Sequence, residues 1–220
     1  MTGEEEKVEI CEEYGIERKN TPLEGKNICF LGSSVVFGSA SGEWSVPEYF
    51  AARFGCSYTK EAVCGTTLVD SDALSYVSRL KKIDKSIRFD LFICQLSTND
   101  ASKGNPLGDT GSGGEYDTST VTGAIEFIIN YVRETWNCPV VFFTGSRNGS
   151  DRYGAMVKRL LEIKEKYGIG VLDLWNGDVF NLLPDDKRTV YMHDPIHPTK
   201  AGYREWWGPE LEKQLLDFLG

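Results

Sequence analysis

The sequence is short of the residues that several classes of protein need. It holds only two histidines, and its six cysteines include no Cys-x-x-Cys pair, so a zinc site would have few ligands. It has no apolar run long enough to cross a membrane. Lys and Arg number 24 against 33 Asp and Glu, which gives a net charge of -9, and they form no basic stripe. These absences argue against a metalloenzyme, a membrane-spanning protein and a nucleic-acid partner.

The acidity is concentrated at the beginning of the sequence. Eight glutamates and three basic residues fall within residues 1–25. This segment has neither the basic start nor the apolar core of a secretory leader, so we expect a cytoplasmic protein with reduced thiols. We expect residues 1–25 to form an acidic leader, peripheral or mobile, and residues 26–220 to form a single domain.

Short apolar runs alternate with segments of helical periodicity along the rest of the chain. The runs that predict strands cover residues 28–31, 57–63, 89–96, 139–143 and 169–174. The helical spacing of apolar residues predicts helices over residues 44–54, 120–136 and 150–167, with another between the second and third strands. This order predicts a parallel sheet with helices on both faces, in the common strand order 2-1-3-4-5.

The sequence also predicts the structure of three connecting segments. A helix capped by Asp70 or Ser71 is expected to bury Leu74. Residues 101–118 are rich in Gly, Ser, Asn and Asp, which predicts a long loop over the end of the sheet, either an idle insertion or a mobile lid. Near the C-terminus, one helix is expected to end at Gly208 and the next to begin at Pro209.

A pair of serines follows the first predicted strand, in Gly32-Ser33-Ser34. Open α/β sheets bind ligands at the carboxyl ends of their strands, and a backbone that turns there can offer N–H groups to a developing negative charge. Ser34 is the candidate nucleophile and Ser33 its neighbour, although both could be ordinary turn serines. The stretch is neither a G-x-S-x-G nucleophile elbow nor a phosphate loop, because the required glycines and Lys-Ser or Lys-Thr pair are missing.

Both histidines of the chain lie in the stretch from His193 to Pro198. Two imidazoles four residues apart would suit a metal on a helix, but Pro195 and Pro198 disfavour a regular helix and few other ligands remain. A turning backbone can instead bring Asp194 to His197, where the carboxylate orients the ring and stabilises the imidazolium. We therefore expect Ser34, His197 and Asp194 to act as a catalytic triad, with His193 as a neighbour that lines the pocket.

A tetrahedral intermediate also needs hydrogen-bond donors. Asn99 offers a side-chain amide after the third predicted strand, and Gly65 offers an unshielded backbone amide after the second. With the amide of Ser34 they would form an oxyanion hole. The alternatives are a helix cap for Asn99 and a plain turn for Gly65.

These four pieces, in this order, resemble the four blocks of the SGNH or GDSL hydrolase superfamily. Gly32-Ser33-Ser34 is similar to its Gly-Asp-Ser block, Gly65 to its glycine block, Ser97-Thr98-Asn99-Asp100 to its Gly-x-Asn-Asp block, and Asp194-Pro195-Ile196-His197 to its Asp-x-x-His block. Ser33 and Ser97 depart from the family, which usually has Asp and Gly there. The resemblance implies a flavodoxin-like α/β/α sandwich, no cofactor, and hydrolysis of esters of carbohydrates, lipids or small molecules.

We therefore expect a serine esterase that removes a small acyl group, such as acetyl, from a carbohydrate or another polar alcohol. The polar loop at residues 101–118 and the polar turn at Gly145-Ser146-Arg147-Asn148 favour this substrate over a lipid. The expected partner is a small-molecule ester, with no nucleic acid, membrane, cofactor or metal. A lipase or lysophospholipase, an acyltransferase and a noncatalytic binding module on the same fold remain alternatives.

Overall fold

A five-stranded sheet lies at the centre of the computed structural model, which describes residues 15–111 and 114–220. All neighbouring strands are parallel, in the order β2-β1-β3-β4-β5, so the predicted α/β/α fold and its strand order are confirmed. The strands are β1 (Asn27–Gly32), β2 (Ser57–Ala62), β3 (Leu91–Gln95), β4 (Val140–Phe143) and β5 (Gly170–Leu172).

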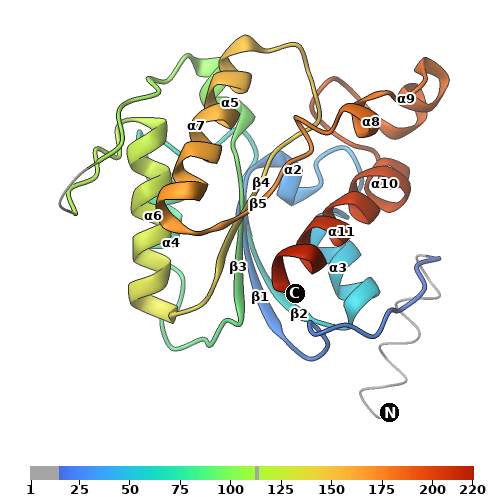
Figure 1. Cartoon of the computed structure of the whole chain (residues 1–220), viewed down its shortest axis with the longest axis horizontal. Coiled ribbons are helices and arrows are strands. Elements are labelled where there is room, and N and C mark those ends of the chain that lie inside the picture. Colours follow the sequence, from blue (N-terminus) through green and yellow to red (C-terminus); the bar gives the residue numbers. More distant parts are fainter. Residues whose placement is uncertain (1–14, 112–113) are drawn as a thin grey trace.

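Each face of the sheet is covered by its own layer of helices (Figure 1). Successive side chains of a strand point to opposite faces, so the apolar run of β1 supplies both cores. Cys29 and Leu31 pack into one buried cluster, and Ile28 and Phe30 pack into the other. The first cluster includes α4 (Tyr76–Leu80), α6 (Val121–Trp136) and α7 (Asp151–Tyr167), and the second includes α3 (Val46–Phe54) and α11 (Gly208–Leu219).

The C-terminal helical segment is continuous, which corrects the break predicted at Gly208-Pro209. The short helix α10 (Lys200–Gly202) leads through a π-helical turn, η1 (Tyr203–Trp207), into α11. Gly208 keeps right-handed helical angles, φ -56° and ψ -52°, and its amide donates to the carbonyl of Tyr203. Pro209 has no amide hydrogen and its ring would clash with the preceding turn of an α-helix. The wider π-helical turn accommodates the proline without ending the helix.

The helix after the second strand begins later than predicted. Its cap is Ser75, whose hydroxyl accepts a hydrogen bond from the amide of Ser78, and Leu74 before it is 53% exposed. Asp70 contributes from a distance, because its carboxylate accepts from the hydroxyls of Ser75 and Ser78 at 2.6 and 2.7 Å. Asp70 therefore supports this helix without being its cap.

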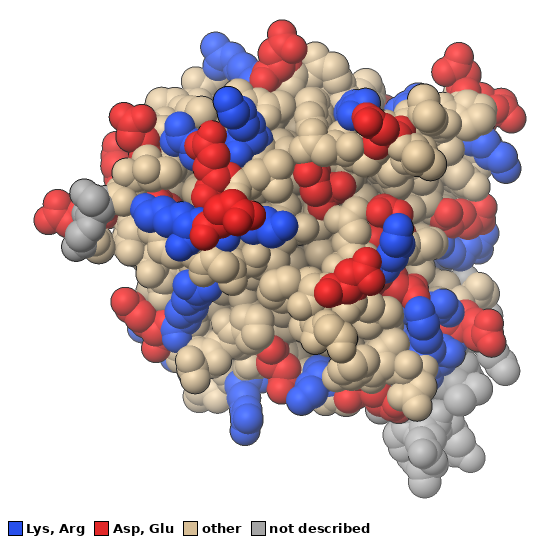
Figure 2. Space-filling view, viewed as in Figure 1, with Lys and Arg blue, Asp and Glu red and all other residues tan. Residues whose placement is uncertain are grey.

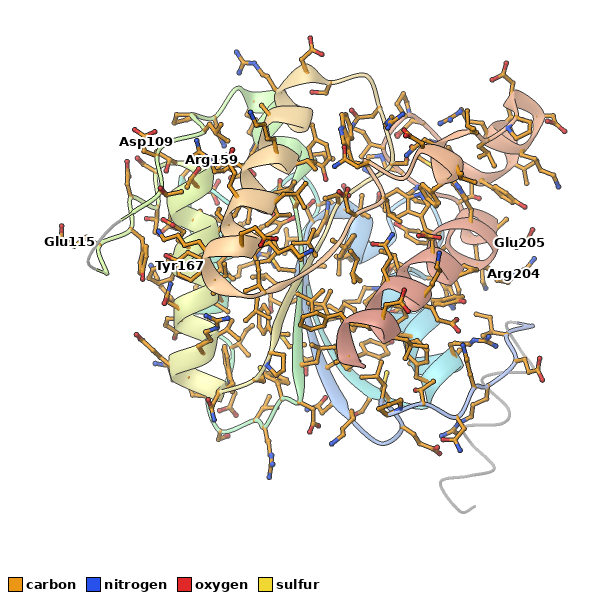
Figure 3. The ribbon with its side chains drawn as sticks, viewed as in Figure 1. Asp109, Glu115, Arg159, Tyr167, Arg204 and Glu205 are labelled. Carbon is orange, nitrogen blue, oxygen red and sulfur yellow. The ribbon has the colours of Figure 1, made fainter. Side chains whose placement is uncertain are left out.

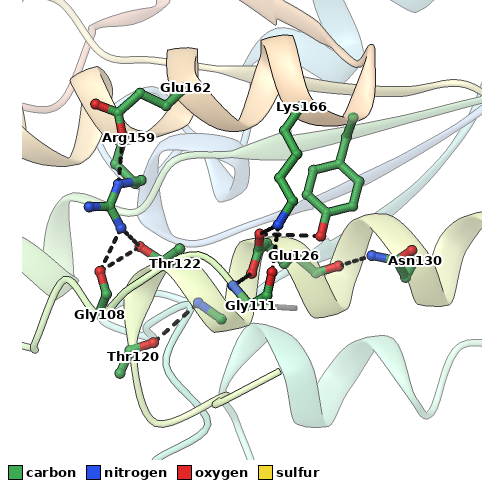
Figure 4. A network of polar contacts seen from close by, with 11 residues as sticks. Gly108, Gly111, Thr120, Thr122, Glu126, Asn130, Arg159, Glu162 and Lys166 are labelled. Carbon is green, nitrogen blue, oxygen red and sulfur yellow. Dashed lines mark hydrogen bonds and ion pairs between the residues drawn. The ribbon is translucent and has the colours of Figure 1, made fainter. Parts of the chain in front are cut away.

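The described part of the polar stretch at residues 101–118 lies near the end of the sheet at its start, where Nζ of Lys103 donates to the carbonyl of Gly65. It starts inside a helix, α5 (Thr98–Lys103), and then runs along α6 and α7, where Asp109 and Arg159 are labelled in Figure 3. Arg159 donates to the carbonyl of Gly108, and Lys166 donates to that of Gly111 at 2.7 Å. The buried carboxylate of Glu126 accepts from the Gly111 amide at 2.6 Å (Figure 4). These bonds hold the part of the loop around Gly108 and Gly111 against α6 and α7.

Part of the predicted acidic leader can be followed. Its residues 1–14 lie outside the described residues. Ile16 and Leu23 are buried in the cluster that includes α3, and the amide of Lys19 donates to the carbonyl of Arg53 at 2.7 Å. Residues 15–25 therefore pack against the helix layer that contains α3.

Acidic and basic side chains are mixed over the face of the molecule seen in Figure 2. Neither sign forms a broad patch on this face. Within the two described ranges, every helix is too short or too polar to traverse a lipid bilayer.

Candidate active site

The turn that carries Ser34 is shaped by its neighbours at the end of β1. Ser34 is the first residue of the short helix α2 (Ser34–Phe37) and is buried. A Cβ at Gly32 would lie 2.2 Å from Cγ2 of Val36, so only glycine fits where the strand turns into this helix. The first amides of a helix have no intrahelical acceptor, which leaves the Ser34 N–H available to a ligand.

The loop before α10 forms a tight turn around Asp194. Oδ1 of Asp194 accepts hydrogen bonds from the amides of Ile196 and His197 at 2.7 and 2.8 Å. The amide of His193 donates to the carbonyl of His197 at 2.9 Å and closes the turn. Asp194 therefore holds the backbone of the segment that presents the His197 ring.

Ser34, His197 and Asp194 lie in one chain of short polar contacts. Oγ of Ser34 is 2.7 Å from Nε2 of His197, and Nδ1 of the same ring is 2.7 Å from Oδ2 of Asp194. Partial burial opposes ionisation of Asp194, but the hydrogen bonds from the His197 ring and the two amides prevail and lower the pKa of its carboxyl group. The structure thus brings together three of the residues singled out from the sequence, although Ser34 and His197 are 163 residues apart.

His193 does not join this group. Its side chain is exposed, and it is not among the residues that line the pocket beside Asp194. Within residues 15–111 and 114–220, His, Cys, Asp and Glu side chains form no group of three or more suited to hold a metal ion. His193 is therefore exposed and stands outside the lining of this pocket.

Asn99 and Gly65 are brought together at the ends of neighbouring segments. Nδ2 of Asn99 donates to the carbonyl of Thr66 at 2.9 Å, and Nζ of Lys103 donates to the carbonyl of Gly65 at 3.1 Å. Gly65 has φ +76°, a left-handed conformation that favours glycine, and it is exposed. One N–H of the Asn99 side-chain amide donates to this loop, and the second N–H can donate to a ligand.

The tetrad Ser97-Thr98-Asn99-Asp100 also stabilises the local fold. Ser97 is the N-cap of α5, and its hydroxyl accepts from the Asn99 amide, so the helix cap considered for Asn99 belongs to Ser97 instead. The fully buried carboxylate of Asp100 accepts from the amides of Leu68 and Val69 at 2.8 and 3.2 Å. The first turn of α5 therefore clamps the loop that contains Gly65.

Two supporting residues were missed from the sequence. Oε1 of Gln95, at the end of β3, accepts from the Ser33 amide at 2.9 Å. The buried guanidinium of Arg79 donates to the carbonyl of Gly32 at 2.7 Å and to the hydroxyl of Thr66 at 3.2 Å. A glutamine inside an apolar strand was a signal for the first, since a buried amide needs partners. No comparable signal marked Arg79, which joins the Ser34 turn to the Gly65 loop.

A pocket of about 360 Å³ opens beside the carboxylate of Asp194. It is bordered by the end of α9 (Asp185–Tyr191) and by the turn after β4. Its lining combines two guanidinium groups with neutral polar and apolar side chains: Arg147, Asn148, Arg188, Thr189, Met192, Asp194 and Pro195. The volume falls in the range of small-molecule sites, roughly 300–1,000 Å³.

Comparison with known proteins identifies the family to which this chain belongs. The sequence model of the GDSL-like Lipase/Acylhydrolase family matches residues 30–205, which include the Ser34 turn and the Asp194–His197 turn. The chain therefore belongs to this family of hydrolases, as its four sequence blocks indicated, and it is an esterase-type hydrolase. A search of curated proteins found no match.

Solved structures show the same fold in several bacterial proteins. A protein from Lactobacillus plantarum has a TM-score of 0.73 at 20% identity, with 89% of this chain and 97% of that chain covered. A possible lipase from Chitinophaga pinensis has a TM-score of 0.63 at 15% identity, covering 87% and 96%. A member of the lipolytic protein G-D-S-L family from Veillonella parvula has a TM-score of 0.57 at 16% identity, covering 87% and 96%. At these identities the likeness concerns the fold alone.

Proposed function

We propose that this chain is a serine esterase whose nucleophile is Ser34. The observation that carries the proposal is the unbroken run of contacts from Ser34 through His197 to Asp194, each 2.7 Å long. An imidazole in contact with a serine hydroxyl can take its proton, and a carboxylate on the other ring nitrogen stabilises the imidazolium that results. The lowered pKa of Asp194 keeps that carboxylate charged at neutral pH.

The reaction would proceed through an acyl-enzyme. As His197 accepts the proton, Oγ of Ser34 attacks the ester carbonyl, and the tetrahedral oxyanion is stabilised by the amides of Ser34 and Gly65 and by the second N–H of Asn99. The imidazolium then protonates the departing alcohol. Water, activated by the same imidazole, attacks the acyl-enzyme and releases the acid. Each oxyanion donor would contribute about 3 kcal/mol to the stabilisation of the transition state.

The substrate we propose is an ester of a short acyl group, such as acetyl, on a carbohydrate or another polar alcohol. The pocket beside Asp194 has room for one sugar ring and offers polar groups from Arg147, Asn148 and Thr189. Hydroxyl-rich ligands need several such partners, because each buried hydroxyl left unpaired opposes binding.

One observation favours a second candidate, hydrolysis of a lipid or another long-chain ester. Val179, Leu182 and Val190 are 86%, 78% and 54% exposed on and between α8 (Asp178–Asn181) and α9, which also contributes to the pocket. Apolar side chains exposed beside a site are common where an apolar ligand binds. A panel of 4-nitrophenyl esters from acetyl to palmitoyl separates the candidates, because a short-chain esterase loses kcat/KM as the chain lengthens.

The catalytic proposal is tested with a fluorophosphonate probe and an acetyl ester. We expect the wild type to be labelled and to turn over the ester, and Ser34→Ala to do neither while keeping its circular dichroism spectrum. The matched control is Ser39→Ala, an exposed serine just after α2, which should retain both properties. Turnover by Ser34→Ala would exclude this nucleophile, and an unlabelled, inactive wild type would indicate a noncatalytic binding module.

A further inference from the structure

A second, much smaller pocket lies between the segments that carry Ser34 and His197. It is bordered by Val35, which follows the nucleophile, and by Ile196, which precedes the histidine. Its other walls come from the ends of β3 and β4 and from η1, including Gln95, Ser146 and Trp207. Its volume of about 10 Å³ is near the lower limit for one water-sized group. The pocket therefore fits a single non-hydrogen atom, and its walls include the residues next to the proposed nucleophile and base.

The walls of this pocket contain buried polar atoms with no partner in the described chain. Ser146 is 2% exposed, and its hydroxyl makes no hydrogen bond with any described residue. Trp207 is 1% exposed, and its indole N–H is likewise unpaired within residues 15–111 and 114–220. Buried polar groups in folded proteins nearly always have partners, so two unpaired groups in the walls of one small pocket point to a ligand atom.

The position of Ser146 is fixed by its neighbours. The amide of Gly145 donates to the hydroxyl of Tyr153 at 2.9 Å, and that hydroxyl donates to the carbonyl of Leu96 at 3.1 Å. Tyr153 therefore has its partners and ties the turn after β4 to the end of β3. Ser146 is presented on a fixed backbone, as a specificity group requires.

We propose that this pocket recognises an oxygen on a short acyl group, so that the preferred substrates are esters of small hydroxy acids. The inference rests on the proposed function, because it concerns the acyl group that Ser34 receives. An indole N–H can only donate and a serine hydroxyl can donate or accept, so together they match a ligand hydroxyl. A methyl group of similar size would leave both protein groups unpaired, and such sites discriminate strongly against the analogue that lacks the oxygen.

The test compares two nearly isosteric esters, 4-nitrophenyl glycolate and 4-nitrophenyl propionate, which differ in a hydroxyl against a methyl group. The measured quantity is the ratio of their kcat/KM values, taken for the wild type and for Ser146→Ala. Comparing the ratio between enzymes cancels the difference in intrinsic reactivity of the two esters. We expect Ser146→Ala to lower the glycolate-to-propionate ratio by at least about tenfold. The matched control is Ser57→Ala, at the opposite end of the sheet, which should keep the wild-type ratio.

An unchanged ratio in Ser146→Ala would overturn the proposal and make the pocket a structural one. Should Ser146→Ala fail to fold, Trp207→Phe removes the indole N–H and keeps an aromatic ring, and the same loss of ratio is expected. Fluorophosphonate labelling separates this inference from the function on which it rests. A labelled, active enzyme with an unchanged ratio refutes the hydroxy-acid preference alone, whereas an enzyme that is neither labelled nor active refutes both.

Discussion

Oε1 of Gln95 lies 2.9 Å from the backbone nitrogen of Ser33, which ties the end of β3 to the turn that presents Ser34. The same oxygen is 3.4 Å from the amide nitrogen of Val36, on the other side of the nucleophile. A Cβ at Gly32 would come within 2.9 Å of this oxygen, so the glycine makes room for the contact. Gln95 therefore positions the nucleophile without touching the reacting atoms.

Replacing Gln95 by Met should lower kcat more than it raises KM. Methionine fills a similar volume but cannot accept the two amide hydrogen bonds, so the Ser34 hydroxyl would lose its alignment with His197. Misplacement of this kind by about 1 Å costs roughly 10²-fold in rate. Steady-state kinetics on an acetyl ester and the rate of fluorophosphonate labelling should fall together.

A matched control distinguishes positioning from a general loss of stability. Gln214, on α11, also accepts a hydrogen bond from a backbone amide, that of Asp173 at 2.6 Å. Asp173 directly follows β5, which is the edge strand of the sheet. Gln214→Met should lower the melting temperature and leave kcat near the wild-type value. Equal losses of kcat in both variants would contradict a positioning role for Gln95.

Asp194→Asn should lower kcat by about 10³–10⁴-fold, because an amide cannot stabilise the imidazolium and favours the wrong tautomer of His197. The hydrogen bonds that lower the pKa of Asp194 keep it ionised down to more acidic pH than an ordinary aspartate. A loss of activity between neutral and mildly acidic pH therefore does not report protonation of Asp194. Steady-state kinetics on an acetyl ester measure the change, and a kcat of Asp194→Asn within tenfold of the wild-type value would contradict this role of Asp194.

The sheet and its order could be predicted because they follow from local patterns. The apolar run Ile28–Leu31 closed by Gly32 specifies a strand buried on both faces, and alternation with helices requires parallel pairing. Ser34, Asp194 and His197 could be singled out because each stands in a recognisable block next to a turn. Their joint placement at one edge of the sheet is then a consequence of the topology.

The supporting contacts could not be predicted because they join residues far apart in sequence. Arg79 and Gly32 are 47 residues apart, and nothing local says that a helical arginine reaches the carbonyl that ends a strand. The polar loop after Lys103 was assigned to the sheet edge from composition alone, whereas Lys166, 55 residues from Gly111, holds it on α7. Likewise, Gly-Pro suggested a helix end at residue 208, whereas a π-helical turn, whose Trp206 and Trp207 are buried in the core, continues the helix past it.

Thiol reactivity should be confined to one of the described cysteines. Burial raises the pKa of the Cys138 thiol to about 11 and that of Cys56 to about 12, and it raises those of Cys29 and Cys94 well above the ordinary value. A raised pKa leaves little thiolate at pH 8, and the thiolate is the reactive form. Cys64 is exposed, next to Gly65. Brief alkylation with iodoacetamide followed by peptide mapping should modify Cys64 before the other four, and Cys64→Ser should remove this fast reaction.

Glu212 should make the stability of the fold depend on pH on the acid side. Burial opposes ionisation of this carboxyl group, but hydrogen bonds from Arg53, Lys19 and Tyr49 prevail and lower its pKa below the ordinary glutamate value. A lowered folded pKa means that the stabilisation is complete above the unfolded pKa of about 4.3 and is lost as pH falls through the folded value. At neutral pH, Glu212→Gln should reduce the free energy of unfolding by about 1–3 kcal/mol, since it removes hydrogen bonds to a charged group.

The difference in unfolding free energy between the wild type and Glu212→Gln should therefore be constant from pH 7 to 5.5 and shrink below about pH 4. Urea denaturation followed by circular dichroism at each pH measures it. Glu162→Gln serves as the control, because Glu162 pairs with Arg159 on the surface and its side chain is 51% exposed. Exposed pairs contribute about 0–1 kcal/mol, so this variant should follow the wild type closely at every pH. A Glu212→Gln deficit that persists undiminished at pH 3 would show that Glu212 acts through packing, and not through its charge.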